Sequence, residues 1–352
     1  MIERGNLNIF NELPETSRNM ISNSVAALLV LMLFILIFAA YRTFSVRYSG
    51  VTESMKIAGT TFEIKVNGGN ADESVKNALR KAGEIAGQID YYDEKSEITA
   101  VNNMAGISAV AVSHDTFELL DNALRLCRQT GGAFDITIGP LIDIWNFKSN
   151  SHKEIPSGNQ LVYAQHLVNY YNVQMNPINE TVKLLYPGMK LDLSAAEKGY
   201  VISRIRAMLV QKGVKSAMIK AGTSIAVIGD NKGKPWKIGI RDPKDNYKIA
   251  GRITLEAGQA VSTSADNERH FELAGKRYHD ILDPATGMPA EECRSVTIIS
   301  DDDTQAEMLS KAVFVMGPKR GLDFVKMFKG VNAVIIDKDG NILTTPGLAL
   351  ER

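Results

Sequence analysis

Hydrophobic and polar positions follow a strand period or a helix period along most of the chain. Alternation over 56–66 predicts a strand, and the glycines and asparagines of 67–70 predict a turn after it. Strand-like runs also cover 216–228, 236–240, 248–255, 258–262, 295–300 and 331–336. Helix-like runs cover 71–92, 114–129, 195–212 and 304–316, and Gly131 and Gly213 end two of them. Because strands and helices mix without regular βαβ alternation, the pattern predicts an α+β fold.

One segment departs from this pattern because it is apolar all round. Residues 21–41 carry no charge and would extend roughly 30 Å as a helix, about the thickness of a hydrocarbon core. A cleaved signal peptide is the competing interpretation, but its apolar region is normally shorter, and no basic start or clear A-x-A site is present. We therefore expect an N-terminal tail at 1–20, a transmembrane helix at 21–41, a juxtamembrane linker at 42–55 and a folded domain at 56–352.

Charge limits the possible partners and gives a weak signal on orientation. Lysines and arginines number 40, as do aspartates and glutamates, so no overall field attracts nucleic acid. Arg4 and Arg18 precede the apolar segment, whereas Arg42, Arg47 and Lys56 follow it. This small excess points toward a cytoplasmic C-terminal domain.

Candidate chemistry is concentrated in six polar, glycine-bearing stretches, because the usual signatures GxGxxG, Walker A, HExxH and GxSxG are absent. The six are FDITIGPLIDIW (134–145), LDLSAAEKGY (191–200), IKAGTSIAVIGD (219–230), PWKIGIRDP (235–243), STSADNERHF (262–271) and YHDILDPATGMP (278–289). Each stretch taken alone is typical of a loop. In the last stretch, the Asp-Pro and Thr-Gly pairs are typical of turns.

In their order and spacing, these stretches resemble the ApbE family of flavin transferases, whose members split FAD and attach FMN through a phosphoester to a serine or threonine of a target protein. The resemblance runs from GTTFEIKV, which starts at residue 59, to VFVMG, which ends at residue 317. It implies a mixed α/β body with a flavin cleft, FAD as substrate and Mg²⁺ as cofactor. It also implies a flavinylated membrane redox subunit as target and a location on the periplasmic side of a bacterial inner membrane, against the charge signal.

The resemblance also assigns residues to the cleft. The implied FAD-binding positions are Gly59, Thr60, Phe134, Asp135, Thr137, Asp192, Lys198, Gly222, Trp236, Thr263, Asp283 and Thr286. Among them, Lys198 would supply a fixed positive charge for the pyrophosphate.

The departures from the family concern its chemistry more than its scaffold. Asp280 stands where members usually carry a histidine, with His279 one residue earlier, so either is the expected proton-handling group. Ala285 replaces the usual arginine of the same motif. These changes put the phosphoryl transfer in question, because that reaction needs its nucleophile positioned or deprotonated.

The implied metal site is altered as well. Where the family uses a turn carbonyl, an aspartate and a threonine, this chain carries Glu197, Glu307 and Lys311. Glu197 and Glu307 are candidate Mg²⁺ ligands, but an ammonium has no acceptor and cannot ligate a hard cation. We therefore also expect that Lys311 takes the place of the metal and pairs with Glu197 or Glu307.

Two functions follow from these matches and departures. The retained DITIGP, DPxTG and Lys-Gly elements favour a membrane-anchored FAD:protein FMN transferase. The changes at Asp280, Ala285 and Lys311 favour a catalytically inactive accessory or scaffold subunit of a membrane protein complex.

Overall fold

The computed structural model describes residues 15–48, 50–68, 71–148 and 154–352. Its first helix, α1 (Glu15–Tyr48), contains the predicted span 21–41. The window Ser24–Tyr41 has a mean hydropathy of 2.7 and is long and apolar enough to cross a membrane, as a signal sequence would also be. Most of the predicted tail and half of the predicted turn, at Gly69 and Asn70, lie outside the described residues.

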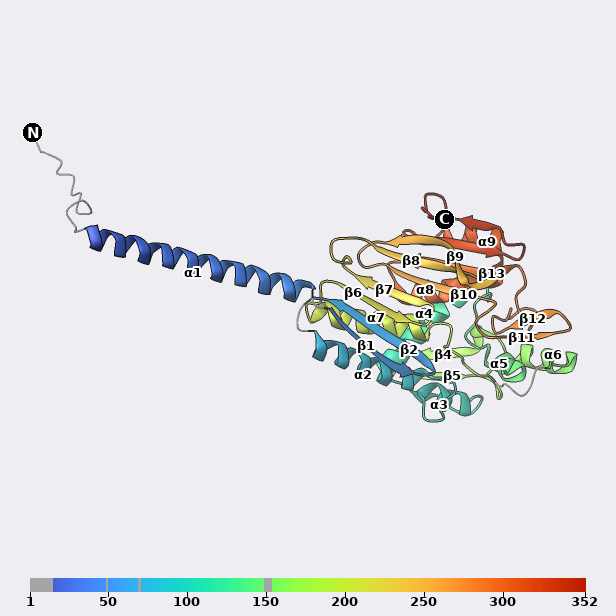
Figure 1. Ribbon diagram of the computed structural model, residues 1–352. Coiled ribbons are helices and arrows are strands. Elements are labelled where there is room, and N and C mark those ends of the chain that lie inside the picture. Colours follow the sequence, from blue (N-terminus) through green and yellow to red (C-terminus); the bar gives the residue numbers. More distant parts are fainter. Residues whose placement is uncertain (1–14, 49, 69–70, 149–153) are drawn as a thin grey trace, which may run out of the picture. The chain divides into compact units, whose positions relative to one another are not determined.

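An antiparallel sheet of eight strands forms the frame of the folded body (Figure 1). Its order is β1 (Gly50–Ile57), β2 (Thr60–Asn67), β6 (Ala217–Ala221), β7 (Ser224–Ile228), β10 (Ala260–Ala265), β13 (Cys293–Ser300), β14 (Asn332–Asp337) and β15 (Ile342–Thr344). Neighbouring strands pair antiparallel throughout. The predicted α+β class is therefore confirmed.

Two runs that the sequence predicts as single strands are hairpins. The run 56–66 is interrupted by Ala58 and Gly59, whose φ angles of 46° and 79° make the two-residue turn that suits a twisted hairpin. The run 216–228 turns at Gly222, where φ is 59°. Residues 50–55, expected in the linker, pair with β2 and belong to β1. A two-residue turn leaves the alternation almost unbroken, which is why periodicity alone missed it.

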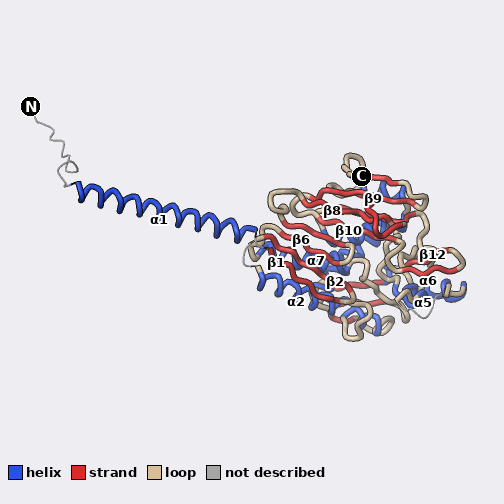
Figure 2. The backbone as a smooth tube through the Cα atoms, in the orientation of Figure 1, coloured by secondary structure: helices blue, strands red, loops and turns tan. Residues whose placement is uncertain are grey.

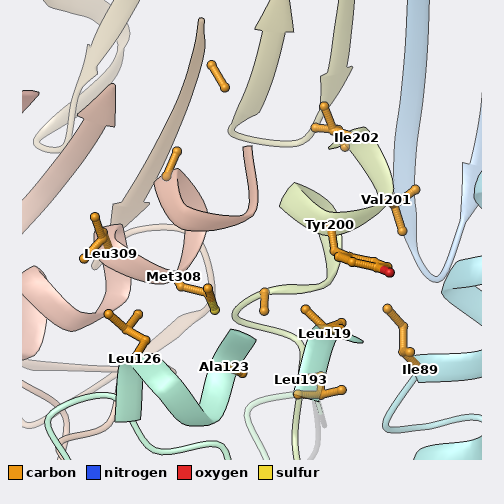
Figure 3. Packing of buried hydrophobic residues seen from close by; sticks show 14 of the residues in the cluster. Ile89, Leu119, Ala123, Leu126, Leu193, Tyr200, Val201, Ile202, Met308 and Leu309 are labelled. Carbon is orange, nitrogen blue, oxygen red and sulfur yellow. The ribbon is translucent and has the colours of Figure 1, made fainter. Parts of the chain in front are cut away.

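Helices cover one face of this sheet and form the main hydrophobic core with it. They are α2 (Asp72–Ile89), α4 (His114–Thr130), α7 (Glu197–Gln211), α8 (Asp303–Met316) and α9 (Pro318–Val325). The four helices predicted from the sequence match α2, α4, α7 and α8. Figure 3 shows how Ile89, Leu119, Tyr200 and Met308 from these four helices gather around one centre.

The opposite face of the sheet is covered by a ribbon of β8 (Trp236–Asp242) and β9 (Asp245–Leu255), which Figure 2 shows among the other strands. Successive residues of a strand point to opposite faces of the sheet, so they belong to two separate hydrophobic cores. Ala226 and Ile228 of β7 face the helices, while Val227 packs with Ile240 and Leu255 of the ribbon. The body is thus built of helices, sheet and ribbon in layers.

The shorter elements have no clear pattern in the sequence and were not predicted. They are α3 (Glu97–Asn103), β3 (Val110–Ala111), α5 (Gly139–Trp145), α6 (Gly158–His166), the 3-10 helix η2 (Tyr170–Asn172), β4 (Val173–Asn176), β5 (Thr181–Leu184), β11 (His270–Leu273) and β12 (Lys276–His279). Around α5, the Trp145 ring stacks on Tyr278 and packs against the tilted ring of Phe271. Its indole N–H donates to the Gly287 carbonyl at 2.7 Å. This bond fastens the loop that follows β12.

The contact between α7 and α8 requires a glycine. A Cβ added at Gly199 would lie 2.4 Å from the Asp303 carbonyl oxygen and 3.0 Å from Glu307 Cβ. Backbone at this distance cannot move aside as a flexible side chain would. Any larger residue would push the two helices apart.

We therefore predict that Gly199→Ala lowers the free energy of unfolding by about 2 kcal/mol, through overpacking against backbone. Gly83→Ala is the matched control, because Gly83 also lies inside a helix but has nothing within 4 Å of an added Cβ. It should raise stability by about 0.5–1 kcal/mol. Urea unfolding of the full chain in detergent measures both, and equal effects of the two substitutions would contradict the close contact.

Candidate active site

Three hollows with shared walls form one cleft in the folded body. The aromatic hollow is lined by Tyr92, Phe134 and Phe147 among others. The central hollow shares Arg269, Asp280 and Lys311 with it. The strand hollow lies against the sheet and the ribbon and shares Gly222, Thr263 and Ala265 with the central one. The cleft therefore has two partly apolar ends and a polar middle.

The hairpin turns of the sheet build one wall of the central hollow. Ala58 and Thr60 come from the turn between β1 and β2, and Gly222 from the turn between β6 and β7. A Cβ at Gly222 would meet Thr60 Cγ2 at 3.6 Å, an ordinary contact, so its φ of 59° rather than lack of space favours glycine. Thr263 completes this wall, and its hydroxyl bonds to that of Thr297 at 2.8 Å.

Behind the opposite wall, the Glu307 carboxylate joins α8 to the start of α7. One oxygen forms an ion pair with the Lys198 ammonium, and the other accepts from the Gly199 backbone N–H. Ala196, at the N-cap of α7, provides no side-chain cap, so Glu307 satisfies a helix donor from outside the helix. Burial alone would lower the pKa of Lys198, but Glu307 and then Glu197 raise it above its usual value. Lys198 is thus a permanent cation held by a buried carboxylate.

These contacts do not leave a magnesium site. Both Glu307 oxygens are engaged, and Glu307 is only 2% exposed. Burial, partly offset by Lys198, raises the pKa of Glu197 to about 8. Across the described residues, no group of three or more metal-ligating side chains comes together. The structure therefore does not assemble the site predicted from Glu197 and Glu307, and the residues present do not fit a Mg²⁺ ion.

Lys311 lines the hollow but does not make the ion pair expected of it. It lies one helical turn after Glu307, whose carboxylate is turned toward Lys198 instead. Within the described ranges, no carboxylate oxygen lies within 4.0 Å of the Lys311 ammonium. Burial lowers the pKa of Lys311, while Asp280 acts in the opposite direction. The pairing of Lys311 with Glu197 or Glu307 is thus a prediction that the structure contradicts.

Of the two predicted catalytic residues, Asp280 is the one that lines the cleft. It lines both the aromatic and the central hollow, and its side chain is 20% exposed. Arg269 Nη1 lies 3.9 Å from its Oδ2, and the Asp280 N–H donates to the Arg269 carbonyl at 3.1 Å. The position allows Asp280 to accept a proton from a group in the central hollow.

His279, the other predicted catalytic residue, is part of the scaffold. It is buried, and Nε2 lies 2.9 Å from the Ala290 carbonyl oxygen, which assigns the proton to Nε2. Nδ1 then accepts from the Ile281 N–H at 3.3 Å. Burial lowers the pKa of His279 to about 4, so the ring is neutral. Both ring nitrogens thus bond to backbone, and His279 is not among the described residues that line the three hollows. Its proton-handling role stays a prediction.

The side chains of the Asp-Pro and Thr-Gly pairs shape the loop by bonding within it. Asp283 accepts from the Ala285 N–H at 2.9 Å and from the Thr286 hydroxyl at 3.3 Å. Gln165 donates to the Ala285 carbonyl at 2.8 Å from outside. The resulting turn places Pro284 on the wall of the aromatic hollow.

Two buried carboxylates of the predicted set also organise backbone. Asp135 accepts from the backbone and hydroxyl of Thr137 at 2.8 and 2.7 Å, and from the Tyr170 N–H at 3.1 Å. Asp192 accepts from the Ser194 N–H at 2.8 Å. Burial raises the pKa of both carboxyls. They line the aromatic hollow chiefly as parts of rigid turns.

The predicted residues thus divide into two groups. Those that line the cleft are Thr60, Phe134, Asp135, Asp192, Glu197, Lys198, Gly222, Thr263, Asp280 and Lys311. Those that lie outside its lining are Gly59, Thr137, Trp236, His279, Asp283, Thr286 and Glu307. Trp236 belongs to the ribbon core, where its indole donates to the Gly229 carbonyl at 3.1 Å.

Sequence reasoning missed several residues of the cleft. Ser194, Glu268 and Arg269 line the central hollow, and Lys148 lies in the aromatic hollow with its ammonium 3.2 Å from the centre of the Tyr92 ring. The first three fall within the polar stretches 191–200 and 262–271. Nothing in those stretches distinguished them from solvated loop residues.

Comparison with known proteins gives consistent matches. The model of the ApbE family matches residues 58–335. An FAD:protein FMN transferase of Klebsiella pneumoniae is 32% identical over 251 residues, which cover 71% of this chain and 77% of the relative. One from Treponema pallidum is 29% identical over 311 residues, covering 83% of this chain and 86% of the relative.

Solved structures agree with these matches. The crystal structure of an ApbE protein from Thermotoga maritima superposes with a TM-score of 0.79 at 33% identity, covering 85% of this chain and 97% of that one. The flavin transferase ApbE of Vibrio cholerae gives a TM-score of 0.76 at 26% identity, covering 85% and 97%. The predicted mixed α/β architecture is confirmed by these likenesses.

The raised pKa of Glu197 predicts a pH-dependent cost of folding. An unfolded glutamate releases its proton near its ordinary pKa of roughly 4.3, whereas the folded carboxyl keeps it up to about 8. The folded state therefore binds more protons in this window, and its stability falls as the pH rises. Glu197→Gln removes this loss. Between pH 5 and pH 9, the free energy of unfolding of the variant should therefore rise by about 2 kcal/mol relative to that of the original chain, a value reduced for partial exposure. Urea unfolding at both pH values measures the difference, and parallel pH profiles would rule out the shift.

Proposed function

The chain belongs to the ApbE family, and on this premise we propose that it binds FAD in the cleft and transfers FMN to a serine or threonine hydroxyl of a partner protein. Relatives that are 32% and 29% identical over the aligned residues carry the name FAD:protein FMN transferase. The proposal gives the chain the same reaction with a modified set of side chains.

The observation that supports it most is the division of the cleft. FAD has a flavin at one end, an adenine at the other and a pyrophosphate between them. The aromatic hollow and the strand hollow offer apolar walls, which include Phe147 and Ile142 in the first and Ile238 and Val261 in the second. The central hollow between them carries the cations Lys198, Lys311 and Arg269. A dinucleotide matches this sequence of apolar, charged and apolar sections.

In the proposed reaction, the oxygen of the acceptor hydroxyl attacks the phosphorus of the FMN moiety. A bond forms between that oxygen and phosphorus, the bond from phosphorus to the bridging oxygen breaks, and AMP leaves with that oxygen. The hydroxyl proton passes to the Asp280 carboxylate, which lines the central hollow. The reaction includes no magnesium step, because Glu307 is engaged with Lys198 and Gly199.

We further propose that α1 anchors the protein by a single pass in a bacterial inner membrane and that the domain from Gly50 onward lies on the periplasmic side. The apolar window of α1 supports the anchor, and the family resemblance supports the side. A membrane redox subunit is then the natural acceptor, while the balanced charge argues against nucleic acid. A topology reporter fused after Arg352 distinguishes the two sides, and cytoplasmic signal would contradict this placement.

A second candidate function is a non-catalytic accessory or scaffold subunit of a membrane complex. The specific observation in its favour is that a lysine, Lys311, stands in the central hollow where the predicted metal would lie. In that case the cleft would bind FAD without consuming it, or would stay empty.

The proposed transferase activity predicts covalent labelling that depends on Asp280. The full chain in detergent, incubated with FAD and a redox subunit that accepts FMN, should yield fluorescent protein-bound flavin and one AMP for each flavin attached. Asp280→Asn should slow this labelling by about 100-fold or more, the usual contribution of a general base.

Asp323→Asn is the control, because Asp323 is an exposed carboxylate that pairs on the surface with Lys326, its one ion-pair partner among the described residues. It should label at the original rate. Absence of labelling by the original chain would leave the scaffold function, and full activity of Asp280→Asn would remove Asp280 from the mechanism.

A further inference from the structure

We propose that the Lys311 ammonium takes the place of a divalent cation on the pyrophosphate, so that FAD binds in the central hollow without metal. The inference rests on the proposed function for the identity of the ligand. It adds Lys311 as a residue that recognises the pyrophosphate. It also removes the requirement for Mg²⁺ that the family resemblance implies.

Lys311 has no partner in its surroundings that matches its charge. Its side chain reaches from α8 to the junction of the aromatic and central hollows. Within the part of the chain that the structure describes, its ammonium makes no ion pair and no hydrogen bond. A partly buried cation with three unused donors is poorly solvated, and an anion in the hollow would satisfy it. The lowered pKa of Lys311, caused first by burial, is consistent with a missing partner.

The charges around the central hollow leave Lys311 without a counter-ion. Lys198 is neutralised by Glu307, and Arg269 lies 3.9 Å from Asp280. The other carboxylates of the described lining, Glu197 and Glu268, form no ion pair with Lys311 within 4.0 Å. Lys311 is therefore the cation of the described lining that is free to meet an added negative charge.

A divalent ion would be repelled at this place. A Mg²⁺ ion needs several oxygen ligands, but the Glu307 oxygens are occupied and no suitable cluster occurs among the described residues. The ion would also lie in the hollow lined by Lys311, whose charge no described carboxylate neutralises. A charged phosphate is attracted by the same ammonium.

An equilibrium measurement tests the inference without relying on transfer. Binding of FAD to the full chain in detergent is followed by flavin fluorescence, once in excess EDTA and once in excess Mg²⁺. The two dissociation constants should agree within about twofold, and inorganic pyrophosphate should compete in EDTA. A dissociation constant that requires Mg²⁺, or no binding in either buffer, would overturn the inference.

Variants then assign the effect to one side chain. Lys311→Met keeps most of the volume and removes the charge, and it should weaken FAD binding about 10- to 100-fold, as expected for a lost charge-assisted hydrogen bond. Lys311→Arg should restore most of the affinity. Lys319→Met, an exposed lysine on α9, is the control and should bind as the original chain does. An unchanged affinity of Lys311→Met, with its fold verified by thermal unfolding, would contradict the assignment.

These outcomes separate the inference from the proposed function. Metal-independent binding of FAD without covalent labelling supports the role of Lys311 and rejects the transferase. Labelling that stops in EDTA and returns with Mg²⁺ supports the transferase and rejects the role of Lys311.

Discussion

The Glu307 carboxylate determines how two helices meet and what the cleft above them can bind. Its oxygens accept from the Lys198 ammonium and the Gly199 N–H, so one side chain of α8 caps α7 and neutralises the lysine. A buried carboxylate needs such partners, because an unpaired one would be strongly disfavoured. The approach is close enough only because residue 199 has no Cβ. Packing and electrostatics therefore depend on the same contact.

This contact has a direct consequence for the chemistry. A carboxylate that is committed to Lys198 is not available to a metal. The positive charge that a phosphate in the central hollow would need is then supplied by side chains. Lys311 is in the right hollow and lacks a counter-ion in the described part of the chain. Changes that first suggest a lost site thus also fit the proposed site, in which an ammonium takes the place of the metal ion that the family resemblance implies.

Periodicity predicted the long helices and the α+β class, because a helix of several turns shows its apolar stripe in sequence alone. It missed the hairpins at Ala58 and Gly222, whose two-residue turns barely interrupt the alternation. The family resemblance identified the stretches that line the cleft, including Lys198 and Asp280. It did not show the role of Glu307, because its partner Lys198 lies on another helix, far away in the sequence. His279 and Arg269 contact Ala290 and Asp280, which are nearer in the sequence, but only the folded loop shows these partners.

The most direct test of the account is a crystal structure of the chain with FAD in a solution that contains Mn²⁺, whose anomalous signal marks any bound ion. We expect the Lys311 ammonium within hydrogen-bonding distance of a pyrophosphate oxygen, the pair of Lys198 and Glu307 intact, and no anomalous peak in the central hollow. A manganese peak beside the Glu307 carboxylate, with Lys198 displaced from it, would contradict the account.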